Sequence, residues 1–215
     1  MIQKPTDNKA RAIRHCGQLM MSPAGIGLLL QRQLEHPPLF GALGSVENGK
    51  IARVRMMAIG EFNIRDMTLL TSADRRSAKV RQLRACSKAE LCIWLPDLAA
   101  QLRLLLVWRV IADGGAGIVE RDRIIYDQLW QRHQQELQHL YNGPPPGRPV
   151  SMPRQHQPRH NAARHDPSGI TPPRNFAVLA GRIIAMDALV LTVPEPQRYR
   201  HRRLSDRWET LKINS

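Results

Sequence analysis

Apolar and polar residues follow one another in a pattern that predicts mostly strands with a few helices. Within residues 25–35, apolar side chains recur at the i, i+3, i+4 and i+8 positions of one helical face, and Pro37 and Pro38 end this helix. Two apolar stretches follow, separated by "ENGK" at residues 47–50. Asn-Gly between such stretches is the strongest short signal of a β-hairpin. We therefore expect a helix followed by two antiparallel strands.

The rest of the chain continues this strand-rich pattern. We predict a third strand in "DMTLLTS", a helix beginning near Ser77, a fourth strand in "AELCIWLP" and a long fifth in "QLRLLLVWRVIAD". Residues 121–141 return to the helical period, with an apolar face of Ile125, Leu129, Trp130, Leu137 and Tyr141. Two or three strands follow residue 175. This order, with short connections, indicates a mainly β (α+β) fold: an antiparallel β-barrel with flanking helices.

Chain length and proline distribution predict the domain organisation. A chain of 215 residues is long enough for one substantial core, so we expect a single domain, 1–215, with an N-terminal helical extension, 1–36. Residues 144–173 hold nine of the sixteen prolines together with scattered arginine and histidine. Such a composition buries little apolar area, so residues 143–174 are predicted to form a Pro/His/Arg-rich loop. Its histidines, His156, His160 and His165, are typical of a basic loop rather than of a metal site.

The sequence contains no signal for a membrane or for secretion. No run of 18 apolar residues is present, and the N-terminus lacks an apolar segment with a small-residue cleavage site. Its three cysteines, Cys16, Cys86 and Cys92, are odd in number and are not at metal-ligand spacing, so we expect reduced thiols. A cytoplasmic location with no membrane partner is the resulting expectation.

The net charge of +14 would attract any polyanion. The basic residues are nevertheless spread over the whole chain, and aromatic residues make up only 5%. Because single-stranded nucleic acids need aromatic side chains for stacking, this composition disfavours nucleic-acid binding without excluding it.

The stretch "TSADRRSAKVRQL", residues 71–83, is the first candidate for chemistry. A strand leads here into a helix, whose first amide hydrogens and dipole favour an anion, and Arg76, Ser77 and Lys79 can add charge-assisted hydrogen bonds. A phosphate is the predicted ligand. The alternative interpretation is an N-cap serine among solvated charges. Arg55 on an earlier strand and Arg198 on a late strand favour the phosphate.

Taken in order, these motifs resemble the pyridoxamine 5'-phosphate oxidase-like family of FMN-binding split β-barrels. The elements that carry the resemblance are Arg55 before "MMAI", the stretch "TSADRRSAK", Gln101 to Arg103 in "QLRLLL", and the closing strands around "QRYRHRRLSDRWETLKIN". The similarity extends from about Pro38 to Ser215 and lies in the order and spacing of the motifs.

The resemblance implies that FMN is the cofactor and that the chain forms a homodimer with FMN at the subunit interface. Arg55, Arg76, Ser77 and Lys79 would hold the phosphate, and Gln101 would face the isoalloxazine ring. Arg198 would approach the flavin from the late strand, and Gln134 and Gln135 would be weaker contacts across the dimer. The implied cofactor-binding residues are Arg55, Met56, Thr71, Ser72, Arg76, Ser77, Lys79, Gln101 and Arg198.

By this resemblance, the predicted function is that of an FMN-dependent oxidoreductase acting on a small-molecule substrate. Gly60 occupies a position where the family usually has lysine or arginine, and "TVPEPQR" replaces the family's substrate motif. These departures favour one alternative, a non-catalytic barrel that binds a flavin or another anionic ligand. A basic nucleic-acid-binding protein is the other. Neither the catalytic residues nor the substrate and electron acceptor follow from the sequence.

Overall fold

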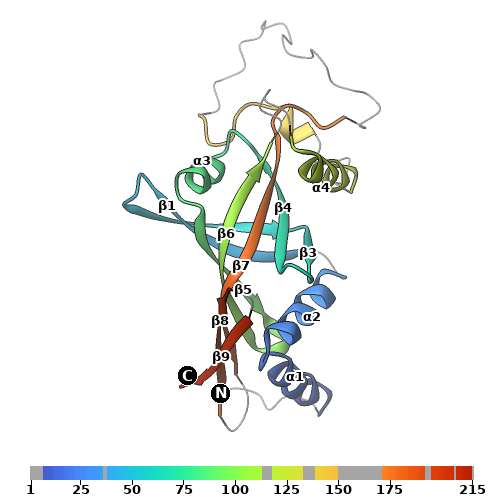
Figure 1. Cartoon of the computed structure of the whole chain (residues 1–215), viewed down its shortest axis with the longest axis vertical. Helices are drawn as coiled ribbons and strands as arrows, with labels where there is room; N and C mark the ends of the chain where they lie inside the picture. Colours follow the sequence, from blue (N-terminus) through green and yellow to red (C-terminus); the bar gives the residue numbers. More distant parts are fainter. Residues whose placement is uncertain are drawn as a thin grey trace, which may run out of the picture.

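One continuous antiparallel sheet builds the protein in this computed structural model (Figure 1). The structure describes residues 7–35, 38–112, 118–132, 139–149, 171–191, 195–205 and 207–214. The helices are α1 (Asp7–Leu19), α2 (Pro23–Leu34), α3 (Ala78–Ala85) and α4 (Glu120–Gln131), with short 3-10 turns at Pro96–Leu98 and His139–Tyr141. The strands are β1 (Leu39–Glu47), β2 (Ile51–Ile59), β3 (Glu61–Asn63), β4 (Thr68–Asp74), β5 (Lys88–Leu95), β6 (Ala100–Ile111), β7 (Phe176–Val190), β8 (Gln197–Leu204) and β9 (Arg207–Ile213).

Neighbouring strands run in the order β2-β1-β5-β6-β7-β4-β3, and β8 and β9 extend the sheet from β7. The long strands β6 and β7 lie along the molecule, with α3 and α4 toward one end and α1 and α2 beside the other (Figure 1). The predicted antiparallel barrel with flanking helices is confirmed. The predicted hairpin is also present: β1 pairs with β2, and Asn48 and Gly49 adopt φ values of 52° and 69° in the turn.

The structure differs from the prediction at three places. The second strand does not continue through residue 63: it ends at Ile59, and the amide of Gly60 donates to the Leu70 carbonyl on β4 at 3.0 Å. The short strand β3 therefore pairs with β4. A helix not predicted as a separate element, α1, precedes α2. Finally, the helix predicted for 121–141 ends at Gln131, and residues 139–141 form a 3-10 turn.

Two groups of buried apolar side chains stabilise the fold. The larger fills the barrel and includes Leu43, Leu91, Leu102 and Leu104. The smaller lies where α4 packs on β7, and there the rings of Tyr126, Trp130 and Tyr141 surround Phe176 with edge-to-face contacts. This second group holds α4 and the 139–141 turn beside the end of β4. The candidate phosphate site begins at that end.

None of the described helices is long and apolar enough to cross a bilayer.

Candidate functional site

Strand β4 leads through residues 75–77 into α3, and Ser77 is the N-cap of this helix. An N-cap serine ordinarily accepts a hydrogen bond from an amide of the first helical turn. Ser77 makes no such bond; its Oγ is buried and has no hydrogen-bond partner among the described residues. A buried hydroxyl without a partner is costly in a folded protein. The start of α3 therefore has a hydroxyl for which a ligand could supply the missing hydrogen-bond partner.

Lys79 lies in the first turn of the same helix and is half-buried. It makes no ion pair and no hydrogen bond within the described part of the chain. Burial lowers the pKa of Lys79, the positive charge of Arg55 lowers it further, and Asp74 opposes the shift. Because two cations destabilise each other here, an anion bound between them would be favoured.

Arg55 reaches the same region from β2. Its guanidinium donates to the Gln82 Oε1 at 2.7 Å, to the Leu43 carbonyl at 3.4 Å and to the Ser45 hydroxyl. None of these acceptors carries a charge. Burial lowers the pKa of Arg55, Arg53 adds to this effect, and Glu47 opposes it. The positive charge of Arg55 is therefore held in place without being neutralised by its hydrogen-bond partners.

These three side chains meet the chemical requirements of a phosphate site. A phosphate offers several strong acceptor oxygens and a negative charge. Among the described residues, the hydroxyl of Ser77 has no hydrogen-bond partner and Lys79 makes no ion pair, and the first amide hydrogens of a helix have no partner within the helix. The residues present thus fit the phosphate of FMN at the start of α3.

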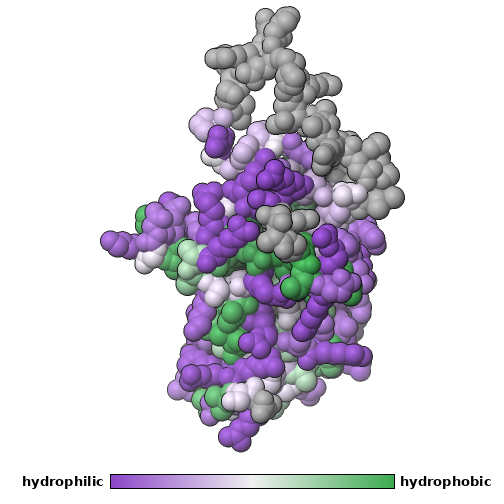
Figure 2. All heavy atoms as spheres, turned by 45° about the horizontal axis from the view of Figure 1, so that its top comes forward, coloured by the Kyte–Doolittle hydropathy of each residue, from purple (hydrophilic) through white to green (hydrophobic). Residues whose placement is uncertain are grey.

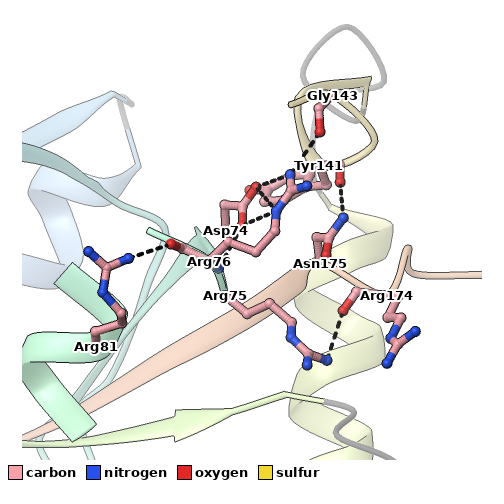
Figure 3. Close-up of polar contacts among 8 residues, drawn as sticks. All are labelled: Asp74, Arg75, Arg76, Arg81, Tyr141, Gly143, Arg174 and Asn175. Carbon is pink, nitrogen blue, oxygen red and sulfur yellow. Dashed lines mark hydrogen bonds and ion pairs between the residues drawn. The ribbon is translucent and has the colours of Figure 1, made fainter. Parts of the chain in front are cut away.

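Arg76, the neighbouring predicted phosphate ligand, is engaged elsewhere (Figure 3). Its Nε and Nη2 donate to both carboxylate oxygens of Asp74, with the shortest contact at 2.6 Å, and Nη2 also donates to the Gly143 carbonyl at 3.0 Å. Asp74 neutralises this arginine, and the pair ties the start of α3 to the turn that follows the 3-10 segment.

Thr71 and Ser72 lie on β4 and border two cavities. Thr71 is buried, and its hydroxyl donates to the Ala58 carbonyl at 2.6 Å, which links β4 to β2. The larger cavity, about 750 Å³, has apolar and charged residues in its lining, which includes Leu34, Phe40, Ala58, Gly60, Phe62, Thr71, Ser72 and Leu129 as well as Glu35, Glu61 and Arg132. The smaller, about 520 Å³, is lined by Ser72, Lys79 and Tyr141 among others. Ser72 borders both, so the two cavities adjoin at β4.

Met56, Gln101 and Arg198 are not part of the group around α3. Side chains of directly opposed residues in antiparallel strands share a face of the sheet. The register pairs Trp94 with Gln101, Gln101 with Leu189, and Leu189 with Arg198, so these side chains share one face. The register also pairs Met56 with Ala42, Ala42 with Cys92, and Cys92 with Arg103, which lies two residues from Gln101 on β6. Met56 therefore shares this face, and the adjacent Arg55 points to the opposite side.

We call this face of the sheet the outer face. Its Arg198 is bound through Nε and Nη2 to both carboxylate oxygens of Asp187 at 2.8 Å. Asp187 raises the pKa of Arg198. Strands β5 and β1 lie between Gln101 on β6 and Arg55 on β2. Within one chain, Gln101 and Arg198 therefore do not join the phosphate site.

Some predicted residues lie outside the described parts of the chain, and some contributing residues were not predicted. The predicted residues outside the described parts are Gln134, Gln135 and the loop histidines. Within the described residues, no three His, Cys, Asp or Glu side chains are grouped to hold a metal. The contributing residues that were not predicted are Ser45 and Gln82, which bind Arg55. No local motif marks them, because the contact joins residues far apart in sequence.

Residues 29–112 match the family model of the pyridoxamine 5'-phosphate oxidase FMN-binding domain. The predicted resemblance to this family is confirmed. The cofactor predicted from the sequence, FMN, is the one that this family domain binds. The matched segment contains Arg55, Ser77, Lys79 and Gln101, whereas Arg198 lies beyond it. No curated protein matches the chain.

Solved structures support the same split β-barrel fold. A pyridoxamine 5'-phosphate oxidase-related, FMN-binding protein from Nostoc punctiforme has 19% identity and a TM-score of 0.70, and the alignment covers 100% of both chains. PhzG from Burkholderia lata, in complex with tetrahydrophenazine-1-carboxylic acid, has 15% identity and a TM-score of 0.64. That alignment covers 87% of this chain and 91% of PhzG. At these identities the similarity concerns the fold.

Proposed function

We propose that the protein is an FMN-dependent oxidoreductase in which Arg55, Ser77 and Lys79 hold the phosphate of FMN. One observation carries the assignment: within the part of the chain that the structure describes, a buried hydroxyl without a partner lies at a helix start, close to a lysine that makes no ion pair. The match of residues 29–112 to an FMN-binding domain supports FMN over other phosphate compounds. A cytoplasmic location stays a prediction.

The cavities support a flavin rather than a bare phosphate. Lys79 borders the smaller cavity, Ser72 borders both, and the larger has the apolar side chains of Leu34, Phe40, Phe62 and Leu129 on its walls. A phosphate at one end and a flat ring at the other match this arrangement. FMN supplies the electron-transfer chemistry when bound. The chain's own part is to hold the phosphate, orient the ring and exclude water, and the larger cavity leaves room for a small-molecule substrate.

We further propose that two copies of the chain associate through the outer face. Phe40, Val54, Met56 and Trp94 expose large apolar side chains there, with Val54 73% and Met56 66% exposed. Figure 2 shows hydrophobic patches among hydrophilic side chains on the face that it displays. Phe40 also lines the larger cavity. A partner on this face would therefore bring its own Gln101 and Arg198 toward the cavity, which would reunite the two groups of predicted FMN residues.

Flavin titration of the purified protein tests the cofactor assignment. We expect FMN to bind more tightly than riboflavin, which lacks the phosphate. Lys79→Ala should weaken FMN binding by about 1.5 to 3 kcal/mol, the range for a hydrogen bond to a charged group. Lys50→Ala, which removes an exposed lysine in the β1–β2 turn, is the matched control and should leave FMN binding unchanged. Equal binding of FMN and riboflavin by the wild type would refute the phosphate site.

The second candidate is a barrel that binds FMN without turnover. Gly60 favours it, because the family's cationic side chain is missing there; a Cβ at this position would lie 3.2 Å from the Leu70 carbonyl oxygen and 3.4 Å from Leu129, so a larger residue would require its neighbours to shift. The bound flavin is reduced and then exposed to oxygen or another acceptor, which distinguishes the oxidoreductase from the non-catalytic barrel. A flavin that is reduced and reoxidised repeatedly supports the oxidoreductase. A flavin that binds but fails to cycle with any reductant supports the non-catalytic barrel.

A further inference from the structure

We propose that Gln82 and Ser45 are positioning residues that anchor Arg55 without neutralising its charge, and so keep this arginine available for a phosphate. The inference rests on the proposed function, because it assigns a role to side chains behind a proposed FMN ligand. It identifies two residues that the sequence motifs leave out.

The three side chains form a closed set of hydrogen bonds. Arg55 Nη2 donates to Gln82 Oε1 at 2.7 Å, and Arg55 Nη1 donates to the hydroxyl of Ser45. That hydroxyl in turn donates to Gln82 Oε1 at 2.6 Å. Ser45 and Gln82 are each only 6% exposed. Buried partners on β1 and α3 thus fix the position of an arginine that extends from β2.

The hydrogen bonds also fix the orientation of the Gln82 amide. Two donors, the guanidinium and the serine hydroxyl, converge on the same amide atom. Only an oxygen can accept both, because the amide nitrogen has hydrogens of its own and would repel a guanidinium. The end of Gln82 that faces Arg55 is therefore a neutral acceptor.

Several arginines elsewhere in the described structure have carboxylate partners. Arg76 binds Asp74, Arg103 binds Glu90, and Arg198 binds Asp187. Such pairs have little net charge to offer a ligand. A neutral amide supplies hydrogen bonds of similar geometry, yet it leaves the whole positive charge of Arg55 in place beside Lys79. The choice of glutamine over glutamate at position 82 therefore favours anion binding at the start of α3.

The substitution Gln82→Glu tests this inference, because it changes the charge behind Arg55 and almost nothing else. Fluorescence titrations of FMN and riboflavin are run on wild type, Gln82→Glu and Gln18→Glu. Gln18 is exposed on α1, toward the other end of the molecule from α3 (Figure 1), so Gln18→Glu adds the same charge far from the site. Riboflavin reports any general disturbance of the flavin cavity, and FMN reports the phosphate contacts as well.

We expect Gln82→Glu to weaken FMN binding by roughly twentyfold, the effect of one added charge several ångströms from a phosphate, and to leave riboflavin binding within about twofold. Gln18→Glu should bind both flavins as the wild type does. The inference is overturned if Gln82→Glu binds FMN as tightly as wild type, or if both flavins lose affinity by the same factor. A wild-type protein that binds FMN no more tightly than riboflavin would instead refute the proposed function.

A second variant covers the possibility that Gln82→Glu does not fold. Ser45→Ala keeps every charge and removes the hydroxyl between Arg55 and Gln82. We expect a roughly threefold loss of FMN affinity with unchanged riboflavin affinity, since one hydrogen bond that orients Arg55 is lost. Unchanged FMN affinity in a folded Ser45→Ala protein would contradict the positioning role.

Discussion

The charge that an arginine presents to a ligand depends on the partners of its guanidinium. Arg76 and Arg198 each bind both oxygens of a carboxylate, whereas Arg55 binds three neutral oxygens. A bidentate pair with a carboxylate uses the same donors that would grip a phosphate. Of the arginines that the motifs indicate, Arg55 is therefore the best placed to bind FMN in a single chain, together with Ser77 and Lys79.

Ser77→Ala separates a ligand-binding serine from a helix-capping serine. Because Ser77 makes no capping bond, its loss should change the free energy of unfolding of the apoprotein by less than about 0.5 kcal/mol. FMN affinity should fall by about 1 kcal/mol, because the hydroxyl is then missing from the phosphate site. Titration of flavin and thermal unfolding measure the two effects.

Ser22 provides the opposite control. It caps α2, and its hydroxyl accepts from the Gly25 amide at 3.1 Å. Ser22→Ala should therefore lower the free energy of unfolding by about 1 kcal/mol and leave FMN affinity unchanged. A Ser77→Ala protein that loses stability like Ser22→Ala, with normal FMN affinity, would show that Ser77 serves the helix and not the ligand.

FMN affinity should depend on pH in two ranges. Below about pH 6 the phosphate takes up a proton and its attraction to the site weakens. At alkaline pH affinity should fall again when Lys79 loses its proton, and this fall should begin below the ordinary lysine pKa of about 10.4, because burial and Arg55 lower the pKa of Lys79.

Lys79→Arg identifies the group responsible, because a guanidinium stays protonated over this range. The alkaline fall in FMN affinity should then disappear. Riboflavin, titrated in parallel, corrects for ionisation of the ring. An alkaline fall that is unchanged in Lys79→Arg would assign the titration to another group.

At the level of elements, the sequence predicts the strands and hairpin well, because their signals are local. Asn48 and Gly49 specify the β1–β2 turn by themselves. The partners of Arg55 are a different case. They come from β1 and α3, and only the folded sheet brings Ser45 and Gln82 to this arginine. The carboxylate that binds Arg198 likewise lies on β7, one strand away. Motif spacing cannot reveal which cations are neutralised.

Arg76 is better described as a link between elements than as a phosphate ligand. Its bonds to Asp74 and the Gly143 carbonyl join β4 to the turn beside the smaller cavity (Figure 3). Arg76→Ala should lower the free energy of unfolding by about 2 kcal/mol, because Asp74 is nearly buried and loses its counter-ion. The folded variant should keep its FMN affinity within about threefold.

Arg81→Ala is the neighbouring control in denaturant titrations. The guanidinium of Arg81 is exposed and donates to the Arg76 carbonyl, so its loss should cost less than about 0.5 kcal/mol. If Arg76→Ala retained full stability and lost FMN binding by more than tenfold, Arg76 would have to be returned to the phosphate site.

His201 on β8 joins the N-terminal helices to the sheet. Its Nε2 donates to the Met20 carbonyl at 3.0 Å, so Nδ1 of the neutral ring accepts from the Thr210 hydroxyl at 2.9 Å. Burial lowers the pKa of His201, although the Met20 carbonyl and the charge of Asp187 oppose the shift. The folded state therefore favours the neutral ring more than the unfolded state does.

The sign of the pH effect on stability follows from this shift. Well above pH 6.5, the ordinary pKa of histidine, both states are neutral at this residue, and the contribution of His201 is constant. As the pH falls below that value, the unfolded state takes up a proton that the folded state resists, so the free energy of unfolding decreases. We expect His201→Gln to reduce the slope of stability against pH between 6.5 and 5. An unchanged slope would assign the pH dependence to other groups.

At the scale of the whole molecule, the outer face combines exposed apolar side chains with two of the predicted flavin contacts. A net charge of +14 keeps copies of the chain apart unless a specific contact outweighs the repulsion. On the outer face, Asp187 neutralises Arg198, and Glu90 binds Arg103 at 2.8 Å. The pairing of these arginines with carboxylates, on the face that carries Val54, Met56 and Trp94, lowers the repulsion between two copies there, although Asp187 is shared with Arg200.

Met56→Lys should therefore separate the dimer. In a single chain Met56 is 66% exposed, so lysine costs little, whereas at an interface it would place a charge among apolar side chains. Light scattering should show twice the 24.4 kDa chain mass for wild type and the single mass for Met56→Lys. FMN affinity should fall with the loss of the dimer, because Gln101 and Arg198 of the second copy leave the cavity. Ile124→Lys, which changes an exposed apolar residue on α4, should preserve both the dimer and the affinity. A wild-type chain that remains monomeric with FMN bound would show that one chain suffices for the site.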